Sequence, residues 1–308
     1  MTLPCAEPRP CPRQPEASEE SEMSFQMNTS ASTIARVILA ASLVGPLSTH
    51  AQDKPSAPGG GTLERIQKRG SLVVGARLDL PGVVQLNPLT NAVEGFDADI
   101  ARALAARLGL SAAKVRFTEV PSASRETALN QGLVDILIGA YVITPKRRAL
   151  VGQAGPYVDA RAYLYVRSEN RQRYKRPEDI KGKRICTTPT GTSVPVIQQN
   201  EGIFIPFEDV SACTQQVVNS TVDGKMGNDL NNLGFVKQYP DLVAADVPAM
   251  RTEGWGIGLK KDDIAFCRFT SGALKEVVSS GEWQRLWDKH FAPLGVAPQK
   301  PPVVGDEC

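Results

Sequence analysis

The feature that most limits the fold of this chain is an alternation of strand-like and helix-like segments that begins near residue 71. The first five segments are SLVVGARL as a strand, FDADIARALAARLGL as a helix, KVRFTEV as a strand, SRETALNQG as a helix and VDILIGAYV as a buried strand. In the first helix we expect Asp97 to be the N-cap and Gly109 to be the stop. Because strands alternate with helices, this part predicts an α/β unit whose mostly parallel sheet is covered on both faces.

A second alternating series follows the segment RAYLYVRSENRQRYKRPEDIKG. Its members are KRICTT as a strand, PTGTS as a turn, VPVIQQN as a helix start, IFIPFED as a strand and SACTQQVVNSTVDG as a helix that leads to a further edge strand. The chain of 308 residues is long enough for two compact cores, so we predict two α/β units. Ligands of such folds bind beyond the carboxyl ends of the strands.

The first 51 residues do not join this pattern. Residues 1–26 are rich in Pro, Glu and Ser without apolar periodicity, which predicts a disordered leader. From Met27 the chain has a polar, weakly basic start, an apolar run and the small-residue site THA before Gln52, which is typical of a cleavable signal peptide. The apolar run is shorter than the roughly 20 residues that a membrane span needs. We therefore expect a protein secreted to the periplasm, with residues 52–61 as a linker.

Cysteine usage agrees with export. If cleavage falls near Ala51, four cysteines remain in the mature chain, and an even number in an exported protein favours two disulfides. Their spacing leaves all three pairings open. The cysteines are Cys186, Cys213, Cys267 and Cys308.

Composition excludes several classes of function. The net charge of +2 gives no reason to expect a nucleic-acid partner, and the basic run RQRYKRPEDIKGKR is interpreted as a solvated surface loop. The cysteines are widely spaced without a CxxC motif, and His290 is the only histidine of the mature chain. We therefore expect no metal site and no cofactor.

Two stretches at strand ends could bind an anion. Thr144 caps a proline-started helix that presents Arg147 one turn later, directly after a strand. In TPTGTS, which also follows a strand, the backbone N–H groups around Gly191, Thr192 and Ser193 and two hydroxyls can face the same ligand. One unit thus offers a cation and the other a set of N–H donors.

A third stretch, VDGKMGNDLNN, reads as a turn-rich segment after a helix and an edge strand. It brings Asn228 and Asp229 to the second unit. A carboxylate here would add a partner for an ammonium group. The three stretches together suit a zwitterionic ligand.

A run of motifs through most of the mature chain resembles the periplasmic polar amino-acid-binding proteins, the solute-binding proteins of family 3 that feed ABC importers. The glutamate/aspartate-binding branch is the most similar. The motifs that carry the resemblance are ARLDLPG, EGFDADIARAL, RETALNQGLVDILIGAYVITPKRRALVGQAGPY, DIKGKRICTTPTGTS, WGIGLKK and GEWQRLWDKHF.

The resemblance implies the type II periplasmic-binding-protein fold. Its two lobes each hold a mostly parallel sheet flanked by helices, and two crossover strands join them. Lobe one would comprise residues 62–162 and 254–308, and lobe two residues 163–253. The implied function is the capture of a polar or acidic amino acid by a monomeric protein that delivers it to the membrane permease subunits of an ABC importer. The same architecture carries periplasmic dehydratases, so an enzyme acting on a small carboxylic acid is the alternative hypothesis.

The resemblance also assigns roles to individual residues. Arg147 would grip the ligand α-carboxylate, helped by the backbone N–H groups of Val142 and of Thr192 or Ser193. The carbonyl of Ala140 and an acid of lobe two would hold the α-ammonium group. The segment around Asp79 would line the pocket in binders of acidic amino acids. A disulfide between Cys186 and Cys213 is implied as well, and with it one between Cys267 and Cys308.

Three departures from the family pattern affect the choice of ligand. Val142 replaces a hydroxyl-bearing residue, so only its backbone contact remains. Asn228 stands where the ammonium-binding acid is expected; Asp229 comes one residue later, and a one-residue shift in the turn would restore the acid. Otherwise the ligand is a carboxylate without an α-ammonium group. No stacking aromatic stands near Leu78 or Leu80, which disfavours a large cationic side chain such as arginine.

Overall fold

The computed structural model describes residues 61–305 and Cys308. The predicted leader and signal peptide, residues 1–51, and all but the last residue of the predicted linker lie outside this range. In the described part, no helix is both long and apolar enough to cross a membrane.

Strands and helices alternate through the described chain as the sequence predicts. The strands are β1 (Leu72–Ala76), β2 (Asp79–Leu80), β3 (Val84–Leu86), β4 (Val93–Glu94), β5 (Val115–Glu119), β6 (Ile136–Leu137), β7 (Gly152–Arg167), β8 (Arg184–Thr187), β9 (Ile203–Pro206), β10 (Gly224–Asn228), β11 (Leu242–Ala244) and β12 (Arg251–Leu259). The α-helices are α1 (Thr62–Arg69), α2 (Phe96–Arg107), α3 (Arg125–Asn130), α4 (Pro145–Arg148), α5 (Ser193–Gln199), α6 (Val210–Val218), α7 (Asp229–Gln238), α8 (Ile264–Ser279) and α9 (Glu282–His290).

Most strands form one nine-stranded sheet with the order β5-β1-β6-β12-β7-β10-β8-β9, and β11 pairs with β7. The outer pairs β1–β5, β1–β6, β8–β9 and β8–β10 are parallel, whereas β7 and β12 run antiparallel to each other and to their neighbours. Strands β2, β3 and β4 form a separate small sheet. Parallel groups at both ends of the sheet agree with the predicted two α/β units.

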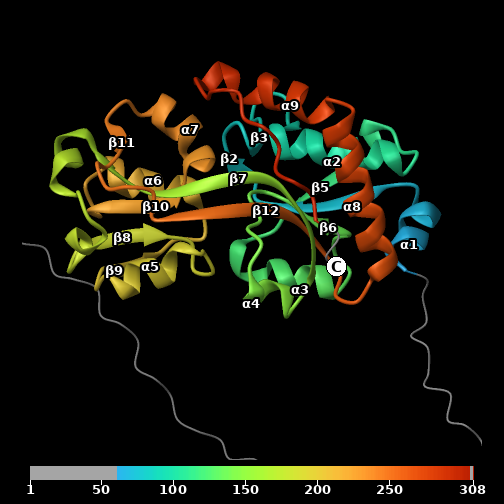
Figure 1. The fold of residues 1–308 in the computed structure, drawn as a ribbon, viewed down its shortest axis with the longest axis horizontal. Helices are drawn as coiled ribbons and strands as arrows, with labels where there is room; N and C mark the ends of the chain where they lie inside the picture. Colours follow the sequence, from blue (N-terminus) through green and yellow to red (C-terminus); the bar gives the residue numbers. More distant parts are fainter. Residues whose placement is uncertain (1–60, 306–307) are drawn as a thin grey trace, which may run out of the picture. The chain divides into compact units, whose positions relative to one another are not determined.

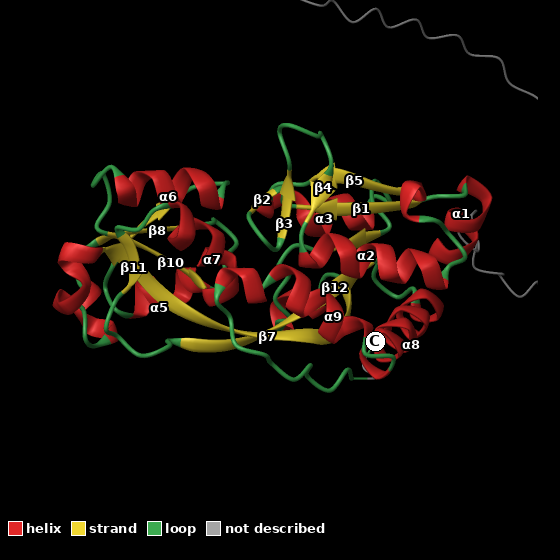
Figure 2. Ribbon diagram, turned by 90° about the horizontal axis from the view of Figure 1, so that it is seen from above, coloured by secondary structure: helices red, strands yellow, loops and turns green. Residues whose placement is uncertain are grey.

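The long strands β7 and β12 connect two lobes. The first lobe is built around β1, β5 and β6, and the second around β8, β9 and β10. Figure 1 shows β7 and β12 side by side between these two groups, and Figure 2 shows β7 from above. In the first lobe, α2 and α9 lie on one side of these strands and α3 and α4 on the other. The predicted two-lobe fold with crossover strands is confirmed.

Each lobe has its own apolar core. The largest cluster belongs to the first lobe and contains an aromatic group in which Phe96 contacts Tyr157, Trp283, Trp287 and Phe291. In the second lobe, separate clusters form on the two faces of the sheet. Two cores joined by a pair of strands allow the lobes to keep their internal packing when the angle between them changes.

The start of α2 differs from the prediction. Gly95, not Asp97, occupies the N-cap position, and it has a φ of 121°. A Cβ atom at Gly95 would lie 2.4 Å from the Val83 carbonyl oxygen, so only glycine fits there. The Asp97 carboxylate instead turns into the protein and accepts a hydrogen bond at 2.9 Å from the Tyr157 hydroxyl. The predicted capping role of Asp97 is therefore wrong, because the side chain links α2 to β7.

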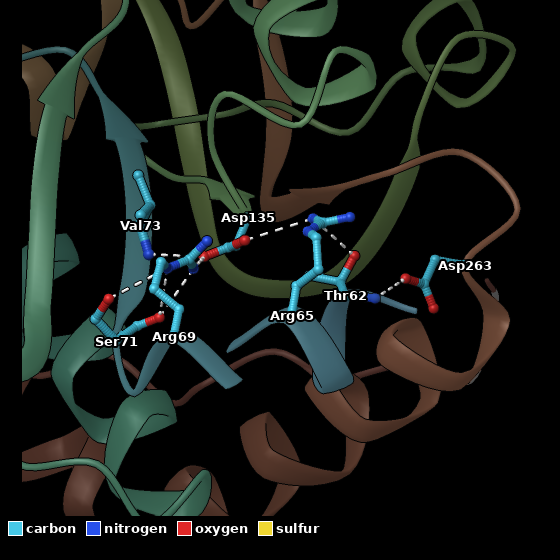
Figure 3. A network of polar contacts seen from close by, with 7 residues as sticks. All are labelled: Thr62, Arg65, Arg69, Ser71, Val73, Asp135 and Asp263. Atoms are coloured by element: carbon cyan, nitrogen blue, oxygen red, sulfur yellow. Dashed lines mark hydrogen bonds and ion pairs between the residues drawn. The ribbon is translucent and has the colours of Figure 1, made fainter. Parts of the chain in front are cut away.

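A polar network fixes α1 on the sheet (Figure 3). The buried Asp135 carboxylate accepts from the backbone N–H of Val73 at 2.8 Å and pairs with the guanidinium groups of Arg69 and Arg65. At the other end of α1, the N–H of Thr62 donates to the carboxylate of Asp263, the N-cap of α8, at 2.8 Å. The starts of α1 and α8 thus meet in the first lobe.

Two disulfides stabilise the fold. One joins Cys186 to Cys213 in the second lobe, and the other joins Cys267 of α8 to Cys308. The pairing that the family resemblance implied is confirmed.

Candidate functional site

The first wall of the site is the turn that follows β6. Gly139 and Ala140 have φ angles of 103° and 51°, a left-handed backbone that is uncommon for alanine. Asp97 holds this turn, since its Oδ2 accepts from the N–H groups of Gly139 and Ala140 at 2.9 and 2.8 Å. Burial raises the pKa of Asp97 to about 6, although these N–H groups and the Tyr157 hydroxyl oppose the shift. The carboxylate under the turn therefore fixes the backbone that faces the ligand.

The helix predicted after this turn is present. Thr144 caps α4, and its hydroxyl accepts from the N–H of Arg147 at 3.1 Å. The helix is only four residues long, and it directs the Arg147 side chain back across the turn. There Nη1 donates to the Val142 carbonyl at 2.7 Å, and Nη2 donates to the Thr190 carbonyl of the second lobe at 3.3 Å. Arg147 thus lies between the two lobes.

Further contacts fix the plane of the Arg147 guanidinium. Its Nε lies 3.4 Å from the Glu126 carboxylate, and its central carbon lies 4.7 Å from the centre of the Tyr141 ring. The Tyr141 hydroxyl donates to the same Glu126 at 2.8 Å. An arginine held by carbonyl, carboxylate and ring contacts is preorganised to bind a carboxylate in two-pronged geometry.

The second wall comes from the segment between β8 and α5. A Cβ atom at Gly191 would lie 2.9 Å from the Thr188 hydroxyl oxygen, so the loop is tightly folded around this glycine. The N–H groups of Thr192 and Ser193 donate no hydrogen bond to any described residue, and the same holds for the N–H of Val142 on the first wall. These donors remain for a ligand, because buried N–H groups require a partner.

A cavity of about 60 Å³ lies between the two walls. Residues of both lobes line this cavity. Arg147, Gly191 and Thr192 also line a larger depression of about 610 Å³. The lining holds hydroxyl groups of Thr187, Thr188, Thr192 and Ser193, amides of Asn228, Asn231 and Asn232, and the cationic side chains of Arg77, Arg125, Arg147 and Lys225. No Asp or Glu of the described chain belongs to this lining.

Two of the cations are neutralised by the protein. Arg77 forms a two-pronged ion pair with Asp79, with Nε and Nη2 at 3.1 and 2.9 Å from the carboxylate oxygens. Arg147 has Glu126 as described above. Since both pairs are internally balanced, the charge that a ligand would meet comes mainly from the other two cations.

Arg125 is the first of the two cationic side chains that form no ion pair with a described carboxylate. It is 4% exposed, and its guanidinium forms no hydrogen bond or ion pair with any described residue. Its central carbon lies 5.0 Å from the centre of the Tyr141 ring. Burial lowers the pKa of Arg125 to about 9, and the neighbouring Arg147 and Arg77 add to this effect. A buried guanidinium in the cavity without a partner marks a place for an anion.

Lys225 is the second cationic side chain of the lining that forms no ion pair with a described carboxylate. It stands in β10, is 2% exposed, and its Nζ donates to the Thr214 hydroxyl at 2.5 Å. Nζ also lies 4.8 Å from the centre of the Phe235 ring. Burial lowers the pKa of Lys225 to about 7, and the positive charge of Arg77 lowers it further than Asp79 raises it. No described carboxylate forms an ion pair with this ammonium group.

The third predicted stretch is not a turn. VDGKMGNDLNN contains β10, which lies between β7 and β8 rather than at an edge, and then the start of α7. Asn228 ends β10 and lines the cavity. Its Nδ2 donates to the buried carboxylate of Glu253, and its Oδ1 accepts from the Asn231 amide at 3.2 Å.

Asp229 does not line the cavity, so it does not replace the missing ammonium-binding acid. Asp229 is the first residue of α7, and its side chain is directed to Arg161 of β7 rather than into the cavity. The Asp229 carboxylate accepts from the N–H of Arg161 at 3.0 Å and lies in a different surface depression. Asp79 does not line the cavity either: behind Arg77, its Oδ2 accepts from the N–H groups of Val210 and Ser211 at 2.6 and 3.2 Å.

The remaining predicted residues meet at the cavity, from both lobes. They are Ala140, Val142, Arg147, Gly191, Thr192, Ser193 and Asn228. Sequence reasoning missed Arg77, Arg125 and Lys225. A signal was present for two of them, because Arg77 follows a strand directly and Arg125 begins a helix. Lys225 gave none, since its segment was expected to be a turn.

Comparison with known proteins agrees with this geometry. Residues 72–293 match the family of bacterial extracellular solute-binding proteins, family 3. The chain is 31% identical over 221 residues to a glutamine-binding protein of Geobacillus stearothermophilus, which covers 71% of this chain and 83% of that protein. It is 29% identical over 270 residues to the glutamate-binding protein GluB of Corynebacterium glutamicum, with coverages of 82% and 88%.

A solved structure gives the same result for the fold. The ancestral amino acid-binding protein AncCDT-1, described as a precursor of cyclohexadienyl dehydratase, matches with a TM-score of 0.69 and 26% identity, over 75% of this chain and all of that one. Its match covers both lobes. By sequence match, lobe architecture and a cleft lined from both lobes, this chain belongs to the bacterial extracellular solute-binding proteins of family 3.

Proposed function

We propose that this protein is the solute-binding component of an ABC importer in the periplasm, and that it captures an acidic amino acid such as glutamate or aspartate. The observation that carries the proposal is the charge of the cavity lining: four cationic side chains and no carboxylate. The glutamate-binding relative supports this class of ligand. The permease subunits of the importer are the expected partner, and the protein is expected to act as a monomer.

The cationic side chains of the lining argue for two acidic groups on the ligand. Arg147 and the free N–H groups of Val142, Thr192 and Ser193 suit the α-carboxylate, as the family pattern implies. Arg125 lies in the same lining without a hydrogen-bond partner. A second carboxylate would neutralise it, whereas a neutral side chain would leave a buried charge without a partner.

An α-ammonium group has acceptors in spite of the missing acid. The Ala140 carbonyl is at the cavity wall, and the Asn228 amide presents its Oδ1 on the cavity side because Nδ2 is bonded to Glu253. The Glu253 carboxylate lies directly behind this amide and supplies negative charge close to the ammonium position. We therefore assign the amino end of the ligand to Ala140 and Asn228.

Ligand capture follows from the two-lobe arrangement. We place lobe one at residues 62–162 and 254–308 and lobe two at residues 163–253. The strand register supports this division, because β12 pairs along β7 up to Ala162, where β10 takes over. Closure brings Arg147 against the second wall, and buried cations make that closed state unfavourable without an anion.

A thermal-shift experiment with a panel of ligands tests the proposal. Wild-type protein should be stabilised by glutamate or aspartate more than by glutamine, alanine or arginine at equal concentration. Arg125→Met should remove most of the shift produced by glutamate. Arg116→Met, which changes an exposed arginine of β5, is the matched control and should behave as wild type. If no carboxylate in the panel raises the melting temperature of the wild type, the proposal is wrong.

Catalysis as a dehydratase is the alternative function for the same cavity. A dehydratase needs a group that transfers protons near neutral pH, and Lys225, with its pKa lowered to about 7, is such a group in the lining. The ancestral structural relative, a precursor of a dehydratase, gives this alternative its support. We expect binding without turnover. Incubating the protein with candidate carboxylic acids and following them by NMR distinguishes the two, since loss of substrate would favour the enzyme.

A further inference from the structure

The inference concerns Lys225, a residue that no motif of the family resemblance includes. Lys225 is buried in the middle of the sheet, and it is one of the residues that line the cavity between the lobes. A lysine at this depth normally has a carboxylate partner. Here the only hydrogen bond among the described residues goes to a hydroxyl, that of Thr214.

The groups around Lys225 do not neutralise it. Thr214 of α6 and Phe235 of α7 contact the ammonium from the second lobe. The charged groups that act on it from the first lobe are Arg77 and Asp79. Asp79 is already bound to Arg77 and to the backbone N–H groups at the start of α6. The nearest negative charge is therefore committed elsewhere.

We propose that Lys225 is a specificity-determining ligand contact, which binds the second acidic group of the ligand together with Arg125 and makes the cleft select doubly acidic over singly acidic ligands. This rests on the proposed function, because it requires a carboxylate ligand in the cleft. Arg77 and Arg147 each form an ion pair with a carboxylate, whereas no described carboxylate forms an ion pair with Arg125 or Lys225. A ligand with a second carboxylate balances this pair, and glutamine in place of glutamate does not.

The alternative is a structural lysine that only fills space beside Thr214 and Phe235. Such a lysine would be replaced by methionine with little effect on ligand choice, because the two side chains have similar length. A ligand contact behaves differently. Removing its charge reduces affinity for the doubly acidic ligand and leaves affinity for the singly acidic one almost unchanged.

Protonation gives a second, independent readout. With its pKa lowered to about 7, Lys225 is only partly charged at neutral pH in the free protein. An acidic group of the ligand favours the charged form, so binding takes up a proton at pH 7 and above. The affinity for a doubly acidic ligand should therefore fall as the pH rises above 7, by at most about tenfold per pH unit. Glutarate is the suitable probe, because it has no amino group that titrates in this range.

The experiment measures dissociation constants by calorimetry for glutamate and glutamine at pH 7, and for glutarate between pH 6.5 and 8.5. The proteins are wild type, Lys225→Met, Lys225→Arg and the control Lys183→Met, which changes an exposed lysine before β8. We expect Lys225→Met to weaken glutamate binding by about tenfold or more, to change glutamine binding less than about twofold, and to flatten the pH profile. Lys225→Arg should keep the preference for glutamate.

Several outcomes separate the possible failures. If wild type binds glutamate and Lys225→Met retains the same preference over glutamine, the role of Lys225 is wrong and the proposed function stands. If the wild type prefers glutamine over glutamate, both the role of Lys225 and the proposed acidic ligand are wrong, and only the solute-binding role stands. If no carboxylate binds to the wild type, both are wrong. Thermal unfolding without ligand serves as the folding control, and Lys225→Met should unfold at or above the wild-type temperature, because it removes a buried charge.

Discussion

At the residue scale, the exchange of an expected acid for Asn228 has a local cause. The Asn228 amide donates to Glu253, which is 4% exposed and has Arg251 3.5 Å away as its only charged neighbour in an ion pair among the described residues. An aspartate at position 228 would place two carboxylates in contact inside the protein. Like charges at that distance cannot both be ionised without a large penalty. The amide is therefore the compatible partner once a glutamate stands at position 253.

This relation can be tested by restoring the acid. Asn228→Asp should lower the free energy of unfolding by about 2 kcal/mol or more at pH 8, because the pair with Glu253 would have to share a proton. The folded pair would hold a proton that the unfolded chain releases, so the loss should shrink as the pH falls towards 5. Urea unfolding at the two pH values measures it. The double variant Asn228→Asp/Glu253→Gln should recover most of the loss; if it does not, direct repulsion is not the cause.

Residue types alone could not have identified every site residue. Arg147 was predictable because its Thr-Pro context fixes a helix start and therefore a direction for the side chain. Arg125 lies in a segment that reads as an ordinary helix start, and Lys225 lies in one that reads as turn-rich. Their role depends on which face of each element is turned to the other lobe, and that is decided by long-range packing. Asp229 was misjudged because the segment was expected to be a turn, whereas the strand ends at Asn228 and Asp229 begins α7.

At the element scale, the junction of α2, β7 and the turn after β6 is organised by a single buried carboxylate. Asp97 starts from α2, accepts from the Tyr157 hydroxyl on β7, and fixes the N–H groups of Gly139 and Ala140. The sequence indicated the helix correctly but not this role, because a short acidic residue near a helix start usually caps it. The N–H groups of Phe96 and Asp97 donate to the carbonyls of Gly82 and Val83 instead, so the helix start needs no side-chain cap and the Asp97 side chain faces inward.

The pH dependence of stability should reveal Asp97. Its pKa is near 3.8 when unfolded and about 6 when folded, so between these values the folded state binds more protons. Its contribution to stability therefore falls as the pH rises from 4 to 7, by roughly 3 kcal/mol at most. Asp97→Asn lacks this titration. It should be less stable than wild type at pH 4, because an amide has one acceptor oxygen, and the two unfolding curves should converge towards pH 7. Parallel curves would contradict the assignment.

At the scale of the whole molecule, the fold was the most predictable feature. Two series of alternating strands and helices were enough to indicate two α/β lobes, and an even number of cysteines in the mature chain was enough to indicate two disulfides. The cleft was less predictable, because it depends on how the lobes face each other. Asp79 illustrates this: it stands in the first lobe, but two of its partners are N–H groups at the start of α6 in the second.

Asp79 should contribute to closure of the lobes. Burial raises the pKa of this carboxyl, but the Arg77 guanidinium and the N–H groups of Ser211 and Val210 outweigh burial and hold the pKa below its usual value. The ionised group therefore bridges the lobes at neutral pH. Asp79→Asn weakens the bridge, so the ligand-free variant should have a larger radius of gyration than wild type in small-angle X-ray scattering. Saturating glutamate should reduce the difference. An unchanged radius in the ligand-free variant would show that the bridge does not contribute.

The bridge formed by Asp79 has a practical consequence for spectroscopy. Because Asp79 belongs to the first lobe and Val210 and Ser211 to the second, we expect their amide protons to lose this carboxylate when the cleft opens. Hydrogen bonding to an ionised oxygen moves an amide proton resonance strongly downfield. Nitrogen-15 labelling would thus turn these two positions into native reporters of each opening event, without attached dyes or engineered cysteines that would compete with the existing disulfides.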